Sequence, residues 1–296
     1  MRMEKRSRQG TSKRISPTHA EYPVRLKRYL SRPQDIYIRG DLSVLQAKTV
    51  GIVGSRRCTA YGREIARRLA KEAAGRGLTV ISGLARGIDT EAHRGTEESG
   101  WRTVAVLATG LDKVYPPENR GLQKRIEDKG LVLSEYPDGS PAKAFNFPVR
   151  NRIIAALSDA LVVVEAGTRS GALITAEAAV EQGKLLYVVP GNITSPASFG
   201  TNKLLSEGAD PLIRPEDLFL ALGVSGRGEK EKREALSAEE RALVNLVTER
   251  GEMTLESLAL AAGYTIGSLN GLVTVLEMKG YLMCEMGRVL PSSALL

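Results

Sequence analysis

The sequence predicts an α/β protein: a doubly wound, mostly parallel Rossmann-like sheet followed by a small C-terminal winged-helix domain. Short runs rich in valine, isoleucine and leucine recur along the first two thirds of the chain, and amphipathic helical patterns separate them. Strands that are apolar on both faces and joined by helices are typical of a parallel sheet covered on both sides. Near the C-terminus, three helical patterns followed by an alternating hairpin predict the winged helix.

Seven apolar runs are the expected strands of this sheet. Each is short, and the loops that follow them contain glycine, proline, hydroxyl residues and arginine. The intervals between the later runs carry the 3.6-residue pattern of helices that pack on a sheet. The expected strands are residues 36–38, 49–53, 78–82, 103–107, 131–134, 160–165 and 185–189.

The composition divides the chain into four segments. Residues 1–20 combine lysine, arginine and serine with almost nothing apolar, which predicts a disordered basic tail. The Rossmann-like domain occupies residues 21–222. A glycine-rich and then charged stretch, 223–236, is typical of a linker. The winged-helix domain, 237–296, begins at a serine–glutamate capping box.

The 296-residue chain carries a formal net charge of +8, which favours a polyanionic partner. The charge is uneven, because residues 1–20 hold six basic side chains against one acidic, whereas residues 237–296 hold four basic against seven acidic. Phosphate contacts by lysine and arginine supply much of the affinity for duplex DNA. An acidic winged helix is therefore more typical of a protein–protein module, and we expect the anion to bind the Rossmann-like domain.

The composition also excludes several classes of protein. No run approaches the roughly 18 apolar residues that cross a bilayer, and the basic first residues lack the apolar segment of a secretory signal. We therefore expect no membrane partner. Cys58 and Cys284 lie far apart and without metal-ligand spacing, which indicates free thiols, no structural zinc and a cytoplasmic location.

The stretch that organises the chain is FNFPVRNRIIA, residues 145–155. Proline fits the first turn of a helix, so we expect a helix to begin near Pro148 with cations at its positive end. Aromatic faces beside guanidinium groups suit single-stranded nucleic acid, where each base can stack and each linkage carries a phosphate. A plain helix start with buried phenylalanines and solvated arginines explains the stretch about equally well. The candidate residues are Phe145, Phe147, Arg150, Asn151 and Arg152.

Two glycine-containing loops, residues 54–57 and 167–171, add anion-binding groups at strand ends, where open parallel sheets bind ligands. Each loop precedes an expected helix, whose first N–H groups have no intrahelical partner. The first loop matches neither a dinucleotide fingerprint nor a Walker loop, and a tight turn that needs glycine explains it about as well. A polar loop at 192–202 could close over the site. The candidate residues are Ser55, Arg56, Arg57, Ser170 and Gly171.

No loop combines a nucleophile, a base and an orienting group, which favours a binding surface over a reaction centre, and we expect no catalysis. Without a second histidine or cysteine near His93 we expect no metal, and we expect no cofactor. His93 lies one helical turn after Asp89 without a serine or cysteine partner, which favours a packed role. Glu165 and Glu177 could form a carboxylate pair, but Glu165 ends an expected strand, where it could equally anchor loop N–H groups. Arginines on several loops fit a repeating anion better than a mononucleotide.

Several sequence blocks occur together in one order, and in them the chain resembles the DNA-processing protein A family (DprA, also called Smf). The resemblance runs from about residue 22 to residue 219, with the winged helix following. The blocks are IVGSR at 52–56, SGLARGID at 82–89 with His93, GLD at 110–112, YP at 115–116 with EN at 118–119, SEYP at 134–137, FPVRNRII at 147–154, VVEA at 163–166, SG at 170–171 and PG at 190–191.

The resemblance implies a non-enzymatic protein that binds single-stranded DNA, dimerises, and helps to load the recombinase RecA on incoming DNA during natural transformation of competent cells. RecA and a second copy of the chain are the implied partners, with single-strand binding protein as a further candidate. Some relatives carry a lysine three residues before Phe147, where this chain has Ala144 and, next to it, Lys143. The family's DNA contacts map here onto Ser55, Arg56, Phe147, Arg150, Asn151 and Arg152.

Two other functions remain open. One is a nucleotide-processing enzyme that resembles the cytokinin-activating phosphoribohydrolases, whose PGGxGTxxE signature is absent here and replaced by AGTRSG at 166–171. The other is a duplex-specific regulator that acts through the winged helix, against which the acidic balance argues. Hydrolysis of nucleoside monophosphates would support the first, and competition by duplex DNA would support the second.

Overall fold

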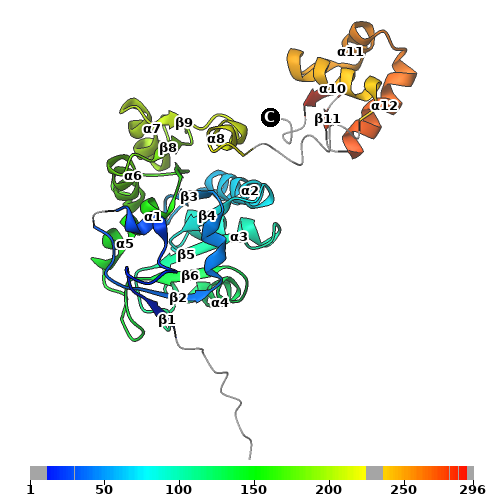
Figure 1. The fold of residues 1–296 in the computed structure, drawn as a ribbon. Helices are drawn as coiled ribbons and strands as arrows, with labels where there is room; N and C mark the ends of the chain where they lie inside the picture. Colours follow the sequence, from blue (N-terminus) through cyan, green and yellow to red (C-terminus); the bar gives the residue numbers. More distant parts are fainter. Residues whose placement is uncertain (1–11, 30, 225–235, 280, 286, 292–296) are drawn as a thin grey trace, which may run out of the picture. The chain divides into compact units, whose positions relative to one another are not determined.

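Nine strands form one sheet in the order β1-β2-β6-β5-β4-β3-β7-β8-β9 (Figure 1). The computed structural model describes residues 12–29, 31–224, 236–279, 281–285 and 287–291, and these belong to two compact units, Met1–Ser225 and Gly226–Leu296. The sheet lies in the first unit. Its strands are β1 (Lys13–Ile15), β2 (Ile36–Gly40), β3 (Thr49–Val53), β4 (Thr79–Ser82), β5 (Thr103–Leu107), β6 (Leu131–Ser134), β7 (Ala160–Val163), β8 (Leu185–Val188) and β9 (Asp210–Pro211).

The sheet is parallel from β6 to β9, whereas β2 pairs antiparallel with β6 and β1 pairs antiparallel with β2. The chain runs outward from β3 through β4 and β5 to β6, then returns to the other side of β3 to form β7. The order of strands therefore reverses between β3 and β7. In open α/β sheets, the crevice at the carboxyl ends of such a pair is the usual ligand site. The predicted doubly wound, mostly parallel sheet is confirmed.

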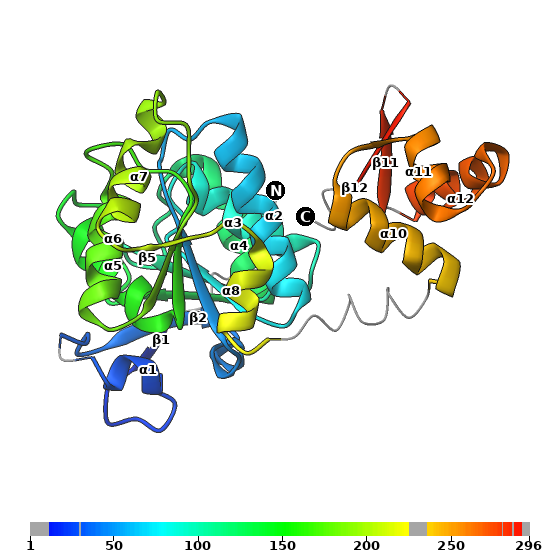
Figure 2. The ribbon, with the colours of Figure 1, turned by 90° about the horizontal axis from the view of Figure 1, so that it is seen from above.

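Helices cover both faces of the sheet (Figure 2). On one face α1 (Val24–Lys27), α5 (Asn146–Leu157) and α6 (Gly171–Glu181) pack against one continuous core. On the other face α2 (Ala60–Gly75), α3 (Ile88–Glu97), α4 (Arg120–Lys129) and α8 (Pro215–Ala221) bury two further clusters. Alternate residues of β5 serve the two faces, since Val104 and Val106 belong to the first core and Ala105 and Leu107 to the second. Strands buried on both sides explain why these runs are almost wholly apolar.

The prediction that residues 1–20 form a disordered tail is wrong for the residues that the structure describes. Lys13–Ile15 form β1, the edge strand, and pair with Ile36–Ile38 of β2. Ile15 is fully buried in the core beside Tyr22. One well-placed isoleucine among basic residues was too weak a signal to predict a strand, because edge strands need few apolar side chains. Residues 1–11 lie outside the described part of the chain.

The predicted polar loop at 192–202 is also partly wrong. A short 3₁₀ turn at Pro196–Ser198 leads directly into α7 (Phe199–Ser206), so the loop is helical in its second half. The Asn202 side chain, within that helix, exchanges hydrogen bonds with the backbone N–H and C=O of Gly191 at 3.2 and 3.0 Å. The segment is thereby tied to the end of β8, which removes much of the freedom that a closing loop would need.

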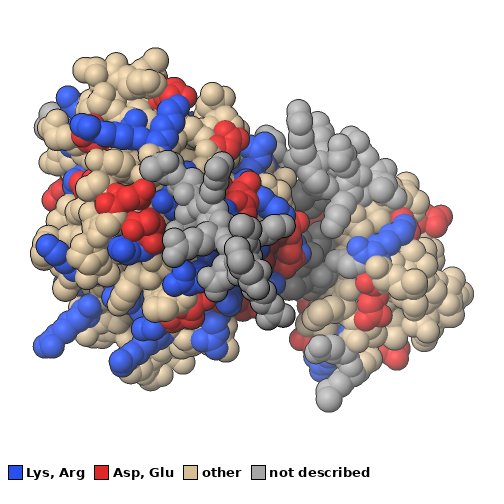
Figure 3. All heavy atoms as spheres, turned by 90° about the horizontal axis from the view of Figure 1, so that it is seen from below, with Lys and Arg blue, Asp and Glu red and all other residues tan. Residues whose placement is uncertain are grey.

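Charged side chains of both signs share the surface. On the face shown in Figure 3, lysine and arginine are interspersed with aspartate and glutamate. Among the described residues many charged side chains are paired, as in Lys71–Glu98 and Arg125–Glu97. Such exposed pairs contribute little to stability. The net positive charge therefore does not by itself identify a binding face, and the site must be located by its geometry.

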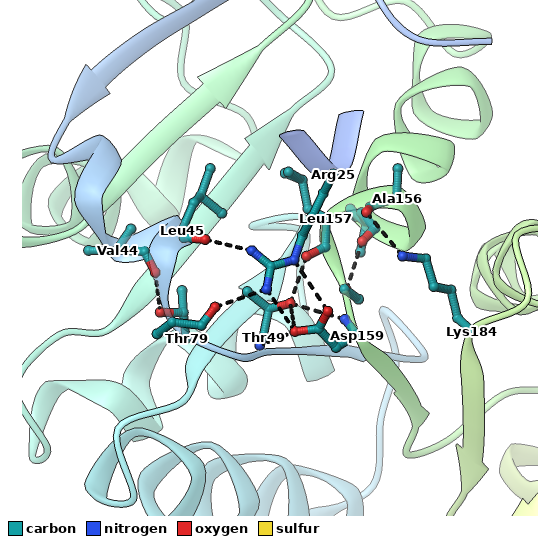
Figure 4. A network of polar contacts seen from close by, with 12 residues as sticks. Arg25, Val44, Leu45, Thr49, Thr79, Ala156, Leu157, Asp159 and Lys184 are labelled. Atoms are coloured by element: carbon teal, nitrogen blue, oxygen red, sulfur yellow. Dashed lines mark hydrogen bonds and ion pairs between the residues drawn. The ribbon is translucent and has the colours of Figure 1, made fainter. Parts of the chain in front are cut away.

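A polar network joins the N-terminal segment to the amino ends of the central strands (Figure 4). Arg25 of α1 donates to the Asp159 carboxylate at 2.8 Å and to the Leu45 and Ala47 carbonyls at 2.6 and 3.0 Å. The same carboxylate accepts a bond from the Thr49 N–H at 2.9 Å. Asp159 stands in the turn between α5 and β7, so one arginine fixes α1, the segment before β3 and this turn together.

The second unit contains the elements expected of a winged helix: α10 (Ala238–Arg250), α11 (Leu255–Ala262), α12 (Ile266–Met278) and the hairpin β11 (Leu282–Glu285) and β12 (Arg288–Pro291). The predicted capping box is present, because the Ser237 hydroxyl accepts from the Glu240 N–H and the Glu240 carboxylate accepts from the Ser237 N–H. A short strand, β10 (Met253–Thr254), which was not predicted, pairs with β12. Of the predicted linker, residues 225–235 lie outside the described part.

Within the described part of the chain, no single helix is long and apolar enough to cross a membrane. Helices α11 and α12 reach that length and composition only as a pair, and they are bent by 104° relative to each other.

Candidate nucleic-acid interface

A cavity of about 860 Å³ lies at the carboxyl ends of β3 and β7, at the reversal of strand order. The segments that follow β3, β4, β5, β6, β7 and β8, together with the first turns of α5 and α6, contribute to its walls. Among the residues that line it are Ser55, Arg56, Arg57, Ala85, Asp89, Tyr115, Phe147, Arg150, Asn151, Thr168, Arg169, Ser170, Gly171, Thr175 and Pro196. The two glycine loops and the organising stretch, which lie between residues 54 and 171 of the sequence, therefore meet as predicted at one place.

Glu165 holds the first loop in place. The Ser55 N–H donates to the Glu165 carbonyl at 2.7 Å, and the Glu165 carboxylate accepts from the Thr59 N–H at 2.9 Å and from the Thr59 hydroxyl. A Cβ atom on Gly62 would stand 2.4 Å from the Glu165 carboxyl carbon, so glycine is needed for this approach. The interpretation of Glu165 as a loop anchor is confirmed, and its carboxylate is committed to the backbone of the site.

The first loop presents two arginines with different surroundings. The Arg56 guanidinium lies over the Phe147 ring, 4.9 Å from its centroid, in a cation–π contact. The exposed Arg57 guanidinium has no hydrogen bond, ion pair or ring contact within the described part of the chain. An arginine without an internal partner at the rim of a cavity is well suited to a phosphate, because binding breaks no existing pair.

Helix α5 begins two residues earlier than predicted, at Asn146, and Pro148 is its third residue. The Asn146 amide donates to the Ala108 carbonyl at 3.0 Å, which fixes the helix start against the end of β5. Phe147 lines the cavity, whereas Phe145 is 65% exposed and Lys143 lies 5.7 Å from its ring. Neither Phe145 nor Lys143 is among the cavity-lining residues, so the structure separates these two candidates from Phe147.

The expectation that Arg150 extends a free guanidinium to phosphate does not agree with its position. The side chain is 3% exposed, and its Nη1 donates to the Gly83 carbonyl at 2.6 Å and to the Val106 carbonyl. Burial lowers the pKa of Arg150 to about 10. Arg150 reaches the cavity only at its floor, where it ties α5 to the ends of β4 and β5. Sequence alone could not reveal this, because the packing of α5 on the sheet decides which helix face is buried.

Asn151 and Arg152 are likewise engaged. The Asn151 amide donates to the Gly171 carbonyl at 3.1 Å, so this cavity residue links the start of α6 to α5. Arg152 pairs with Glu135 at 2.5 Å, and both side chains are largely buried, at 19% and 13% exposure. Burial is the main cause that raises the pKa of Glu135, although the Arg152 charge opposes it. Arg152 is not among the cavity-lining residues, so its guanidinium is not placed to contact a phosphate in the cavity.

The second loop and α6 form the opposite wall. Ser170 is the N-cap residue, and its hydroxyl accepts from the Ala172 N–H. Gly171 follows as the first helical residue and lines the cavity with open space where a Cβ would stand. Next to them Arg169 is exposed, lines the cavity and, like Arg57, has no side-chain partner within the described residues.

The sequence analysis did not select Arg169 and Tyr115, two cavity side chains that are suited to bind a phosphate and to stack on a base. Arg169 lies inside a loop that was identified, between a threonine and the chosen serine. Tyr115 follows β5, and its ring centroid is 5.2 Å from that of Phe147 with the planes tilted by 60°. Both could have been found by taking every cation and aromatic residue in loops at the carboxyl ends of strands.

The two titratable groups at and below the floor of the cavity, Asp89 and His93, make hydrogen bonds that hold the fold. His93 is fully buried, and its Nδ1 shares a 2.7 Å hydrogen bond with the Thr103 hydroxyl, which confirms the packed role. Burial, assisted by the charge of Arg150, lowers the pKa of His93 to about 3. Asp89 accepts from the loop N–H of Ala85, and burial raises its pKa while Arg150 opposes that change. These contacts hold the loop after β4 and provide no pair for nucleophilic catalysis.

Residues 13–223 match the family described as DNA recombination-mediator protein A. The chain is 38% identical over 200 residues to the DNA processing protein DprA of Bacillus subtilis, covering 67% of each chain. It is 38% identical over 253 residues to a putative DprA of Mycobacterium tuberculosis, covering 83% of this chain and 65% of that one.

Two solved structures resemble the fold. The X-ray structure of DprA from Streptococcus pneumoniae superposes with a TM-score of 0.68 at 39% identity, over 71% of this chain and 74% of that one. A DprA structure from Helicobacter pylori, described for its mode of binding single-stranded DNA, superposes with a TM-score of 0.63 at 32% identity, over 68% and 92% of the two chains. The family match, residues 13–223, lies within the first unit.

Proposed function

Because the chain belongs to the DNA recombination-mediator protein A family, we propose that it binds single-stranded DNA in the cavity at the ends of β3 and β7 and acts in DNA recombination. The observation that carries this proposal is that Arg57 and Arg169, which have no side-chain partner among the described residues, line the same cavity as the aromatic residue Phe147. Guanidinium groups bind phosphates and aromatic faces stack on bases, which is the combination that a single strand requires.

Helix α6 adds directed N–H groups to this site. Its N-terminus carries part of the helix macrodipole, and Gly171 leaves room for a phosphate to approach the backbone. Proteins that combine cations with aromatic stacking surfaces bind the phosphates and bases of a single strand with little sequence preference. The proposed ligand is therefore a single strand of mixed sequence, and no observation on the described residues favours nucleotide hydrolysis.

We further propose that the protein helps to load RecA on incoming DNA in natural transformation. It would work as a homodimer in the cytoplasm, with RecA as its main protein partner and single-strand binding protein as a second candidate. Family membership supports these partners. Analytical ultracentrifugation would test the dimer, and RecA filament formation on strands coated with single-strand binding protein would test loading. No stimulation of filament formation by the wild-type chain would contradict the loading role.

The test of the site itself is fluorescence anisotropy with a labelled oligo-dT strand across a salt series, with unlabelled duplex as competitor. For single strands the logarithm of affinity falls with the logarithm of salt by roughly 0.7 per neutralised phosphate. We expect Arg57→Ala to weaken binding and to reduce that slope by about 0.7. Arg102→Ala is the matched control, because Arg102 is exposed at the amino end of β5, on the opposite edge of the sheet.

Absence of binding by the wild-type chain at low salt would overturn the proposal. Binding that duplex DNA displaces as well as single strands would also contradict it. If Arg57→Ala binds with unchanged affinity and slope while the wild type binds tightly, the strand is held somewhere other than at this loop.

A further inference from the structure

The cavity has chemically different ends. The strands that lead into these loops are ordered β5-β4-β3-β7, so the strand before the Tyr115 loop and the strand before the Arg169 loop lie three strand spacings apart. Aromatic side chains gather at the β5 end, where Tyr115 meets Phe147. Arg56 of the β3 loop lies over Phe147, whereas Arg169 and the first N–H groups of α6 lie at the β7 end. A ligand that spans the cavity therefore meets aromatic surface at one side and anion-binding groups at the other.

Tyr115 is the more open of the two rings. Phe147 carries the Arg56 guanidinium at 4.9 Å and lies 6.0 Å from that of Arg150, so a base that stacks on Phe147 must share the ring with a cation. Tyr115 is 40% exposed, and no cation lies over its ring within the described part of the chain. Its contact with Phe147 fixes the ring in place, since tilted aromatic pairs at this separation attract.

Arg169 is the corresponding group at the other end. It is exposed, and no acidic side chain neutralises it among the described residues. It stands one residue before Ser170, the N-cap of α6, so its charge adds to the N–H groups at the start of that helix. By contrast Arg86, in the neighbouring loop after β4, is already paired with Glu118.

We propose that Tyr115 is a base-stacking residue and Arg169 a phosphate-binding residue, so that a bound single strand lies across the strand ends from the β5 loop to the β7 loop. The proposal rests on the proposed function. Three spacings of about 4.8 Å span about 14 Å, which corresponds to about four stacked nucleotides at a rise of about 3.4 Å each. The cavity of one chain therefore holds a short segment of the strand.

The two residues predict different signatures in the anisotropy assay with a labelled oligo-dT. Tyr115→Ala should weaken binding by roughly 5- to 150-fold, the range for loss of one base–aromatic contact, and leave the salt slope unchanged. Tyr115→Phe should bind like the wild type. Arg169→Ala should weaken binding and reduce the slope by about 0.7. Two control variants, Tyr61→Ala and Arg102→Ala, remove an exposed tyrosine and an exposed arginine that do not line the cavity.

An abasic scan tests the stacking contact directly. A single abasic position walked along a short oligo-dT should weaken binding to the wild type at one end of the bound segment, and that cost should disappear in Tyr115→Ala. If the wild type binds but Tyr115→Ala and Arg169→Ala behave like their controls, the inference is wrong and the proposed function stands. If the wild type does not bind at all, both are overturned.

Discussion

Replacing Arg150 by methionine should damage the fold of the first unit before it affects binding. The guanidinium donates to the carbonyls of Gly83 and Val106 and faces the buried carboxylate of Asp89. Leaving a buried acceptor without its hydrogen-bond donor typically costs about 1–3 kcal/mol, and Arg150 donates to two such carbonyls. We therefore expect Arg150→Met to lose about 2–6 kcal/mol of unfolding free energy, which corresponds to about 4–24 °C in Tm for a domain of this size.

The assay is urea unfolding of the full chain followed by tryptophan fluorescence. Trp101 is the only tryptophan of the sequence and is 8% exposed within the first unit, so its signal reports on that unit alone. Arg57→Met is the control, because that side chain is exposed and without a partner in the described residues, and such changes usually stay within about 0.5 kcal/mol.

The pH dependence sharpens this test. The Arg150 charge lowers the pKa of Asp89, while burial raises it. Without Arg150 the pKa of Asp89 should rise further. The unfolding free energy of the variant should then fall as pH rises above the ordinary pKa of an aspartate. The deficit of Arg150→Met should thus be smaller near pH 4 than at pH 7. A variant that unfolds at the wild-type urea concentration but loses oligonucleotide affinity would refute this reasoning and assign Arg150 to phosphate binding.

Two further predictions concern buried polar groups, measured by the same fluorescence assay. His93 has a folded pKa of about 3, below its ordinary value, so its contribution to stability is complete above about pH 6.5 and is lost as pH falls. The wild type should lose about 2 kcal/mol of unfolding free energy between pH 6.5 and pH 5 through this group, and His93→Gln should lose less. Parallel curves of unfolding free energy against pH for the two proteins would exclude His93 as the source. The Arg25–Asp159 pair joins α1 to the turn before β7 at 2.8 Å. A double-mutant cycle with Arg25→Met and Asp159→Asn should give a coupling energy of about 1–2 kcal/mol, whereas additive losses would show that the two side chains act independently.

The sequence was sufficient to predict seven of the nine strands of the sheet and the edge at which the candidate site lies. Strands such as Thr49–Val53 and Thr103–Leu107 were predicted with the bounds that the structure shows, because burial on both faces leaves an uninterrupted apolar signal. The glycine loops could be identified because tight turns and close backbone approaches need glycine. Since parallel strands all end at one edge, these loops were expected to meet, and they do so around one cavity.

Only the tertiary structure decided which side chains face that cavity. The periodicity of α5 does not say that Arg150 lies beneath Phe147 with its guanidinium on two strand-end carbonyls, or that Arg152 pairs with Glu135. Residues one or two positions apart on a helix point in different directions, so the cations of a short motif cannot share one role. Tyr115 and Arg169 belong to loops that follow different strands, and only the order of those strands in the sheet brings them to the two ends of one cavity.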